Sequence, residues 1–108
     1  MERVYNKLVR DRIPEIIESK GEKPITRILD ADEYKKELEI KLNEEYKEML
    51  ETSTSEDRIE ELSDILEIVR ALASLENKTL DDVIKVADEK SVKRGGFEQR
   101  IFLEKVDE

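Results

Sequence analysis

The fold is decided by residues 31–76, which read ADEYKKELEIKLNEEYKEMLETSTSEDRIEELSDILEIVRALASLE. Apolar residues recur in this stretch every three or four positions, which is the period of an amphipathic helix. The run TSTS interrupts that period, and Ser53 with Glu56 has the spacing of a helix-capping box. We therefore predict helices at about 31–51 and 56–76, packed antiparallel because a short turn joins them.

Two further helices flank this pair. Pro14 stands in the first turn of the one predicted at 14–20, and Gly21 follows as a natural stop. Thr79 caps the other, which we expect to run to Arg94, where two glycines end it. The sequence therefore predicts four helices.

Two segments outside the helices are candidates for strands. Residues 25–29 are rich in β-branched side chains, and residues 99–106 read QRIFLEKV. One short strand alone is unstable, so we expect the two to pair. The sequence thus predicts a mainly α single domain over 1–108, with four helices and a small two-stranded β pair.

The composition excludes several classes of protein. A net charge of −9 is the wrong sign for a surface that binds nucleic acid polymers. The chain has neither a membrane-length apolar run nor an apolar leader at its start, so we expect no membrane association and a cytoplasmic location. It contains no Cys and no His, which excludes thiolate and imidazole chemistry. A bound metal must then be a hard cation held by oxygen.

Most carboxylates of the first long helix project into water, but not all. At 100° per residue, Glu45 falls inside the apolar arc, between Tyr34 and Leu38. Glu48 falls at the edge of that arc, and Glu44 falls outside it. One helix therefore points an i, i+3 pair of acids toward the face that must pack.

The next helix repeats the pattern. Its apolar arc is centred near Leu62, and Glu61 falls within the apolar residues on one flank of that arc. Asp64 lies just past the same flank, whereas Glu60 and Glu67 project into water. Antiparallel packing would bring this second acidic pair toward the first.

Such a cluster needs positive charge, because burying unpaired carboxylates is costly. A divalent cation such as Mg²⁺ or Mn²⁺ would supply it through the oxygen ligands that it prefers. Alternatively, Lys and Arg side chains from neighbouring elements neutralise the acids in a structural network. Periodicity alone leaves both interpretations open.

The spacing of these acids resembles that of a known enzyme family. Glu44-Glu45-x-x-Glu48 precedes Glu61-x-x-Asp64 by twelve residues, as in the all-α nucleoside triphosphate pyrophosphohydrolases. The opening YNKLVRDRIP (5–14), and the closing RGGF (94–97) followed by RIFL (100–103), resemble the MazG-like subgroup described as phosphoribosyl-ATP pyrophosphohydrolase-like. The resemblance spans nearly the whole chain.

The resemblance implies a mainly α, four-helix bundle-like fold, assembled as a homodimer or higher homo-oligomer, that binds Mg²⁺ (or Mn²⁺). Its reaction splits a nucleotide substrate between the α and β phosphates and releases pyrophosphate. Carried over by motif, the metal ligands are Glu45, Glu48, Glu61 and Asp64. Glu44 becomes an accessory acid.

Basic residues that would contact phosphate follow from a second pattern. The family carries an Asn/Asp-x-Lys-x-x-basic-Arg run on its last helix, matched here from Asp88 through Lys90 to Arg94. Both basic residues extend the apolar face of that helix, although cations near a helix C-terminus are also favourable by themselves. Near the N-terminus, Lys7 and Arg10 can reach phosphates or remain surface charges.

The expected mechanism uses a metal-activated water, because the chain has no His or Cys nucleophile. Glu48 or Glu44 would accept the proton of that water. Two alternatives stay open. One is hydrolysis of phosphoribosyl-ATP in histidine biosynthesis, which breaks the same type of bond. The other is a helical assembly module with a vestigial metal site.

Overall fold

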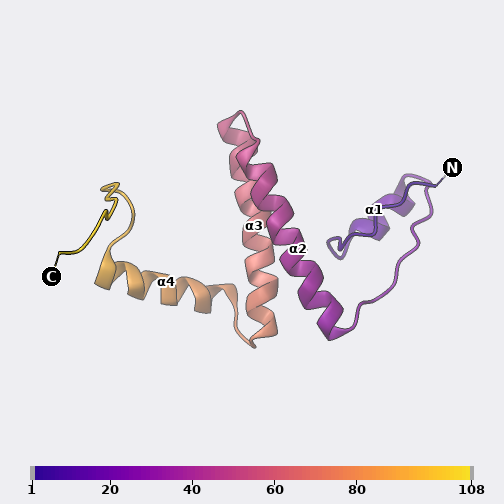
Figure 1. Cartoon of the computed structure of the whole chain (residues 1–108). Helices are drawn as coiled ribbons and strands as arrows, with labels where there is room; N and C mark the ends of the chain where they lie inside the picture. Colours follow the sequence, from indigo (N-terminus) through magenta and orange to yellow (C-terminus); the bar gives the residue numbers. More distant parts are fainter. Residues whose placement is uncertain (1, 108) are drawn as a thin grey trace.

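The computed structural model describes residues 2–107 and contains four helices (Figure 1). These are α1 (Ile13–Ser19), α2 (Ala31–Leu50), α3 (Ser55–Leu75) and α4 (Leu80–Arg94). Every predicted helix is present, with each end within one residue of its predicted position. The mainly α fold is confirmed.

Side-chain caps explain where the helices begin. Asp30 caps α2 by accepting the Glu33 N–H at 2.9 Å. At α4 the predicted cap at Thr79 is confirmed and forms a complete capping box, with Thr79 and Asp82 each accepting the backbone N–H of the other at 3.1 and 2.9 Å. At α3 the predicted cap at Ser53 is wrong by one residue. Thr54 is the residue whose side chain accepts a helix N–H there.

Helix packing is centred on α2 and α3, which run side by side in opposite directions (Figure 1). Leu38 of α2 and Ile68 of α3 are buried. Helix α4 contacts the end of α3 and then leaves the pair, without contacting α2. The arrangement is therefore bundle-like only in part, because one chain does not close a four-helix bundle.

The packed face of α3 differs from the predicted one. Ile59, Leu62 and Leu66, on the face predicted to pack, are 62%, 44% and 46% exposed. The face that meets α2 is instead the flank that carries Glu61 and Ile68. Apolar residues occupy more than half of the circumference of this helix, so periodicity could not decide which part faces α2. The other part remains an open apolar stripe.

The predicted β pair is wrong. No strand occurs within residues 2–107, and segments 25–29 and 99–106 lie toward opposite ends of the molecule (Figure 1). Ile25 and Ile28 are 84% and 96% exposed, so these two β-branched side chains pack on nothing within the described residues. The divergence of α4 carries the second segment away and prevents the two from pairing.

The chain is open for its size. Its radius of gyration is 18.5 Å, whereas a compact domain of this length has about 13 Å. Its accessible surface is 10304 Å², against about 6,200 Å² for a compact monomer of this mass. Only Leu38, Ile68 and Ala73 are buried apolar residues in the described part. None of the helices there is long and apolar enough to cross a membrane.

Candidate metal centre

Three of the predicted acids meet on the seam between α2 and α3. Glu45 comes from α2, whereas Glu61 and Asp64 lie one turn apart on α3. One carboxylate oxygen of each lies within 4.8 Å of the other two. Glu45 is only 8% exposed, and the other two are partly buried. We call these three residues the acidic cluster.

The inner acids of the cluster have no positive partner. The Oε2 atoms of Glu45 and Glu61 are buried and accept no hydrogen bond from any described residue. Burial, then the close carboxylate of Glu61 and the charge of Glu48, raise the pKa of Glu45 to about 7. The seam therefore lacks positive charge where the acids are most buried.

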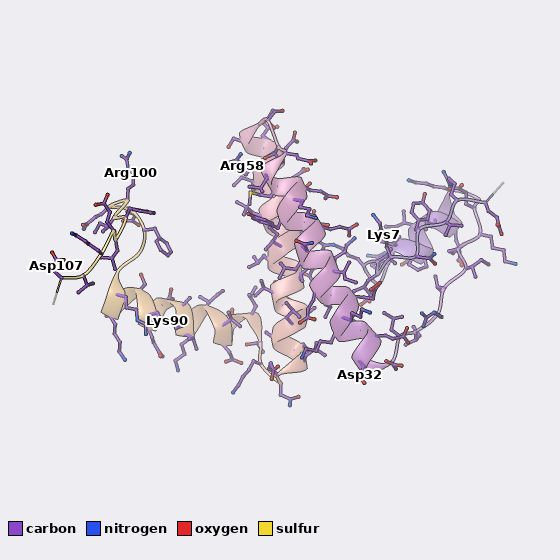
Figure 2. The ribbon with its side chains drawn as sticks, viewed as in Figure 1. Lys7, Asp32, Arg58, Lys90, Arg100 and Asp107 are labelled. Atoms are coloured by element: carbon purple, nitrogen blue, oxygen red, sulfur yellow. The ribbon has the colours of Figure 1, made fainter. Side chains whose placement is uncertain are left out.

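The outer acids do have cationic partners. Lys7, which Figure 2 shows beside α2, places its Nζ 2.8 Å from a carboxylate oxygen of Glu44. Arg10 Nη2 donates a hydrogen bond to Asp64 at 2.7 Å. The hydrogen bond from Lys7 lowers the pKa of Glu44 below its ordinary value, and the same contact raises the pKa of Lys7. A neutralising network of the kind considered from the sequence thus exists at Glu44 and Asp64, but not at Glu45 and Glu61.

Glu48 lies one turn beyond Glu45, on the exposed side of α2. Its charge acts on Glu45, but none of its oxygens belongs to the acidic cluster. This position, at the outer edge of the seam, is open to solvent. It suits a group that reaches an ion or a water from outside.

The acidic cluster fits a hard divalent cation. Its donors are carboxylate oxygens, the ligands that Mg²⁺ and Mn²⁺ prefer. Ligands of an octahedral Mg²⁺ lie about 3 Å apart when adjacent and about 4.2 Å apart when opposite. The oxygens of the cluster lie within 4.8 Å of one another, so these side chains would draw closer together around such an ion. The two buried oxygens without partners mark the place where a positive charge is needed.

The predicted phosphate contacts divide into two groups. Lys7 and Arg10 lie against the acids, whereas Asp88, Lys90 and Arg94 lie exposed on α4. Lys90 and Lys7 are on opposite sides of the α2–α3 pair in Figure 2. Two shallow depressions on α4 include Asp88 and Lys90, but neither includes a member of the acidic cluster. A single chain does not bring the basic residues of α4 to the acids.

Two contacts at the site were not predicted. Arg10 and Asp64 are 54 positions apart, and no sequence periodicity links them. Lys41, by contrast, lies 3.9 Å from Glu44 and three positions before it, so helical spacing alone could have found that contact.

Comparison with known proteins leaves the family open. No protein-family model matches the chain, and no solved structure matches it. A protein of Mycolicibacterium smegmatis, described only as uncharacterized, is 54% identical over 37 residues. That match covers 34% of this chain and 38% of the relative. The chain therefore spans well under half the length of the relative that it matches.

Proposed function

We propose that this chain is a Mg²⁺-dependent nucleoside triphosphate pyrophosphohydrolase, which releases a nucleoside monophosphate and pyrophosphate. The observation that carries the proposal is the pair of buried, unpartnered carboxylate oxygens of Glu45 and Glu61, beside Asp64. Buried acids without positive partners are costly in a protein. A divalent ion would remove that cost and create a site for phosphates. The sequence resemblance gives the reaction.

In this proposal Glu45, Glu61 and Asp64 hold the ion, with Glu48 at the edge. When bound, Mg²⁺ would neutralise phosphate oxygens and lower the pKa of an attacking water. Glu48 is the better base for that water. Glu48 is exposed and forms no ion pair among residues 2–107. Glu44, by contrast, forms an ion pair with Lys7, which lowers the pKa of Glu44. A lower pKa makes a weaker base.

The proposed enzyme is a homodimer or a higher homo-oligomer. The chain exposes about 4,000 Å² more surface than a compact monomer of its mass. A standard interface buries only about 800 Å² per partner. Packing of copies would cover the open apolar stripe of α3. It is also the route by which Lys90 and Arg94 of one copy would reach the acidic cluster of another.

The test is a pyrophosphate-release assay on a panel of substrates, run with and without Mg²⁺. The panel contains the common nucleoside triphosphates, damaged or non-canonical ones, and phosphoribosyl-ATP, since all present the same type of bond. Release that depends on Mg²⁺ is expected for at least one of them. Turnover of phosphoribosyl-ATP alone would assign the chain to histidine biosynthesis.

Metal binding has its own readout in thermal melting. A ligand that binds only the folded state stabilises it by roughly 2.7 kcal/mol at a hundredfold excess over Kd. Millimolar Mg²⁺ is therefore expected to raise the melting temperature. An unchanged melt, no heat of binding and no pyrophosphate release would together leave a helical assembly module as the function.

A further inference from the structure

The segment before α1 reaches the acidic cluster from outside the helix pair. Residues 5–10, here called the arm, have no regular secondary structure. Its Lys7 pairs with Glu44 of α2, and its Arg10 pairs with Asp64 of α3. The arm is therefore held on both helices of the seam by cations.

The two contacts differ in what they touch. Glu44 stands outside the acidic cluster, so Lys7 pairs with an acid that contributes no oxygen to it. Asp64 is a member of the cluster, and its Oδ1 accepts the Arg10 Nη2 hydrogen bond at 2.7 Å. Arg10 thus neutralises one of the three carboxylates that a divalent ion would need.

The inner carboxylates show that the site demands more charge than Arg10 supplies. Glu45 is more than nine-tenths buried, and its Oε2 has no partner in the described part of the chain. A guanidinium at Asp64 leaves that demand unmet. A divalent ion between the three acids would meet it, but it would also face the fixed positive charge of Arg10 at close range.

We propose that Arg10 is a tethered competitor of the metal, which holds Asp64 in the metal-free protein and gives way when a divalent cation enters. This inference rests on the proposed metal centre. The exchange is feasible because the Arg10–Asp64 pair is 56% and 41% exposed. Ion pairs of that exposure are weak, so releasing Arg10 costs little. Arg10 is then free to meet the anionic substrate.

The test is calorimetric titration of the full chain with Mn²⁺, without nucleotide, at about 0.15 M salt, where distant charges are screened. Arg10→Gln is expected to bind Mn²⁺ about two- to fivefold more tightly than wild type, the range that corresponds to losing one exposed ion pair. Arg10→Lys keeps the competing charge and should stay closer to wild type. Helical content by circular dichroism verifies that each variant is folded.

Arg12→Gln is the matched control. It makes the same charge change two residues away, but Arg12, which precedes α1, pairs with Glu15 of α1 at 3.1 Å and not with the cluster. It should bind Mn²⁺ as wild type does. If Arg10→Gln binds no more tightly than Arg12→Gln, the competition is wrong while the metal centre stands. If wild type binds no Mn²⁺, both the metal centre and the competition are wrong.

Discussion

The α2–α3 pair and α4 carry the same kinds of local helix signal but have different surroundings. Both regions have well-formed caps and amphipathic helices. Yet the pair buries Leu38, Ile68 and Glu45, whereas α4 buries none of its residues and leaves Val92 87% exposed. Local signals suffice to form a helix, but its packing partner is not local. Within residues 2–107, α4 has only the end of α3 as a packing partner, and the proposed homo-oligomer would cover the rest of it.

The largest expected effect is on the acids of the pair. Glu45→Gln and Glu61→Gln should each reduce Mg²⁺-dependent pyrophosphate release by at least about a hundredfold, because even residues that only support metal ligands cost 10- to 100-fold when changed. The metal-free variants should be as stable as wild type or more so, since the substitution relieves repulsion.

Glu60→Gln is the control for these variants, because Glu60 is exposed on the same helix. It should leave activity and stability nearly unchanged, within about 0.5 kcal/mol. The contrary pattern is a large loss of stability in Glu45→Gln or Glu61→Gln together with residual activity. That pattern would mean that these two acids neutralise buried cations and do not bind a metal.

The next largest expected effect is on assembly, and it tests whether the exposed surface of α4 forms a contact between copies. Light scattering should give a mass of at least twice the 12.7 kDa of one chain. Val92→Gln should raise the dissociation constant at least about tenfold, because it places a polar group in an apolar contact. The neighbouring exposed residue supplies the control, and Lys93→Gln should change assembly less. A monomer at all concentrations would remove the proposed partner of α4.

The pH dependence of metal-free stability should come from the buried seam. Folded Glu45 keeps its proton up to a pKa of about 7, whereas the unfolded chain loses it near 4.5. Between these values the folded state binds more protons, so raising the pH lowers the free energy of unfolding. We expect a fall of about 1–2 kcal/mol, less than the full linkage, because neighbouring acids share the charge.

Denaturant titrations between pH 4.5 and 7 would measure this fall. Glu45→Gln should flatten the profile, because it removes the group that titrates there. Metal binding should strengthen over the same range, since the proton must leave before the carboxylate coordinates. Equal slopes for wild type and Glu45→Gln would show that another group causes the dependence.

The smallest effect compares the caps of the two regions. Thr54→Ala removes the cap of α3 and should cost about 1 kcal/mol, because α3 unfolds with the core. Thr79→Ala removes the equivalent cap of α4. It should cost the same only if α4 is packed in an assembly. In an isolated chain α4 would fray without changing the main unfolding transition.

The sequence predicted those features that depend on near neighbours. Helix ends followed from caps, glycines and period, and the meeting of Glu45 with Glu61 followed from two helices joined by a short turn. Contacts between distant segments did not follow. The Arg10–Asp64 pair and the absence of strand pairing depend on where the segments outside α2 and α3 lie in space. Helical periodicity carries no information about that.

The face of α3 shows a different limit. Glu61 was correctly expected among apolar residues, but the arc around Leu62 was expected to pack and is instead open. A helix with apolar residues on two faces can pack through either, and a single sequence does not say which one meets its neighbour. Here α2 packs on one face, and in the proposed assembly a second copy would cover the other.

The short turn between α2 and α3 has a consequence for how fast the molecule forms. Contacts between helices joined through so few residues have small sequence separation, and chains dominated by such contacts fold in microseconds to milliseconds. Docking of separate subunits takes milliseconds to minutes and depends on concentration. The acidic seam should therefore form early within each chain. In the proposed assembly, coverage of α4 would follow in a slower phase that accelerates as the protein is made more concentrated.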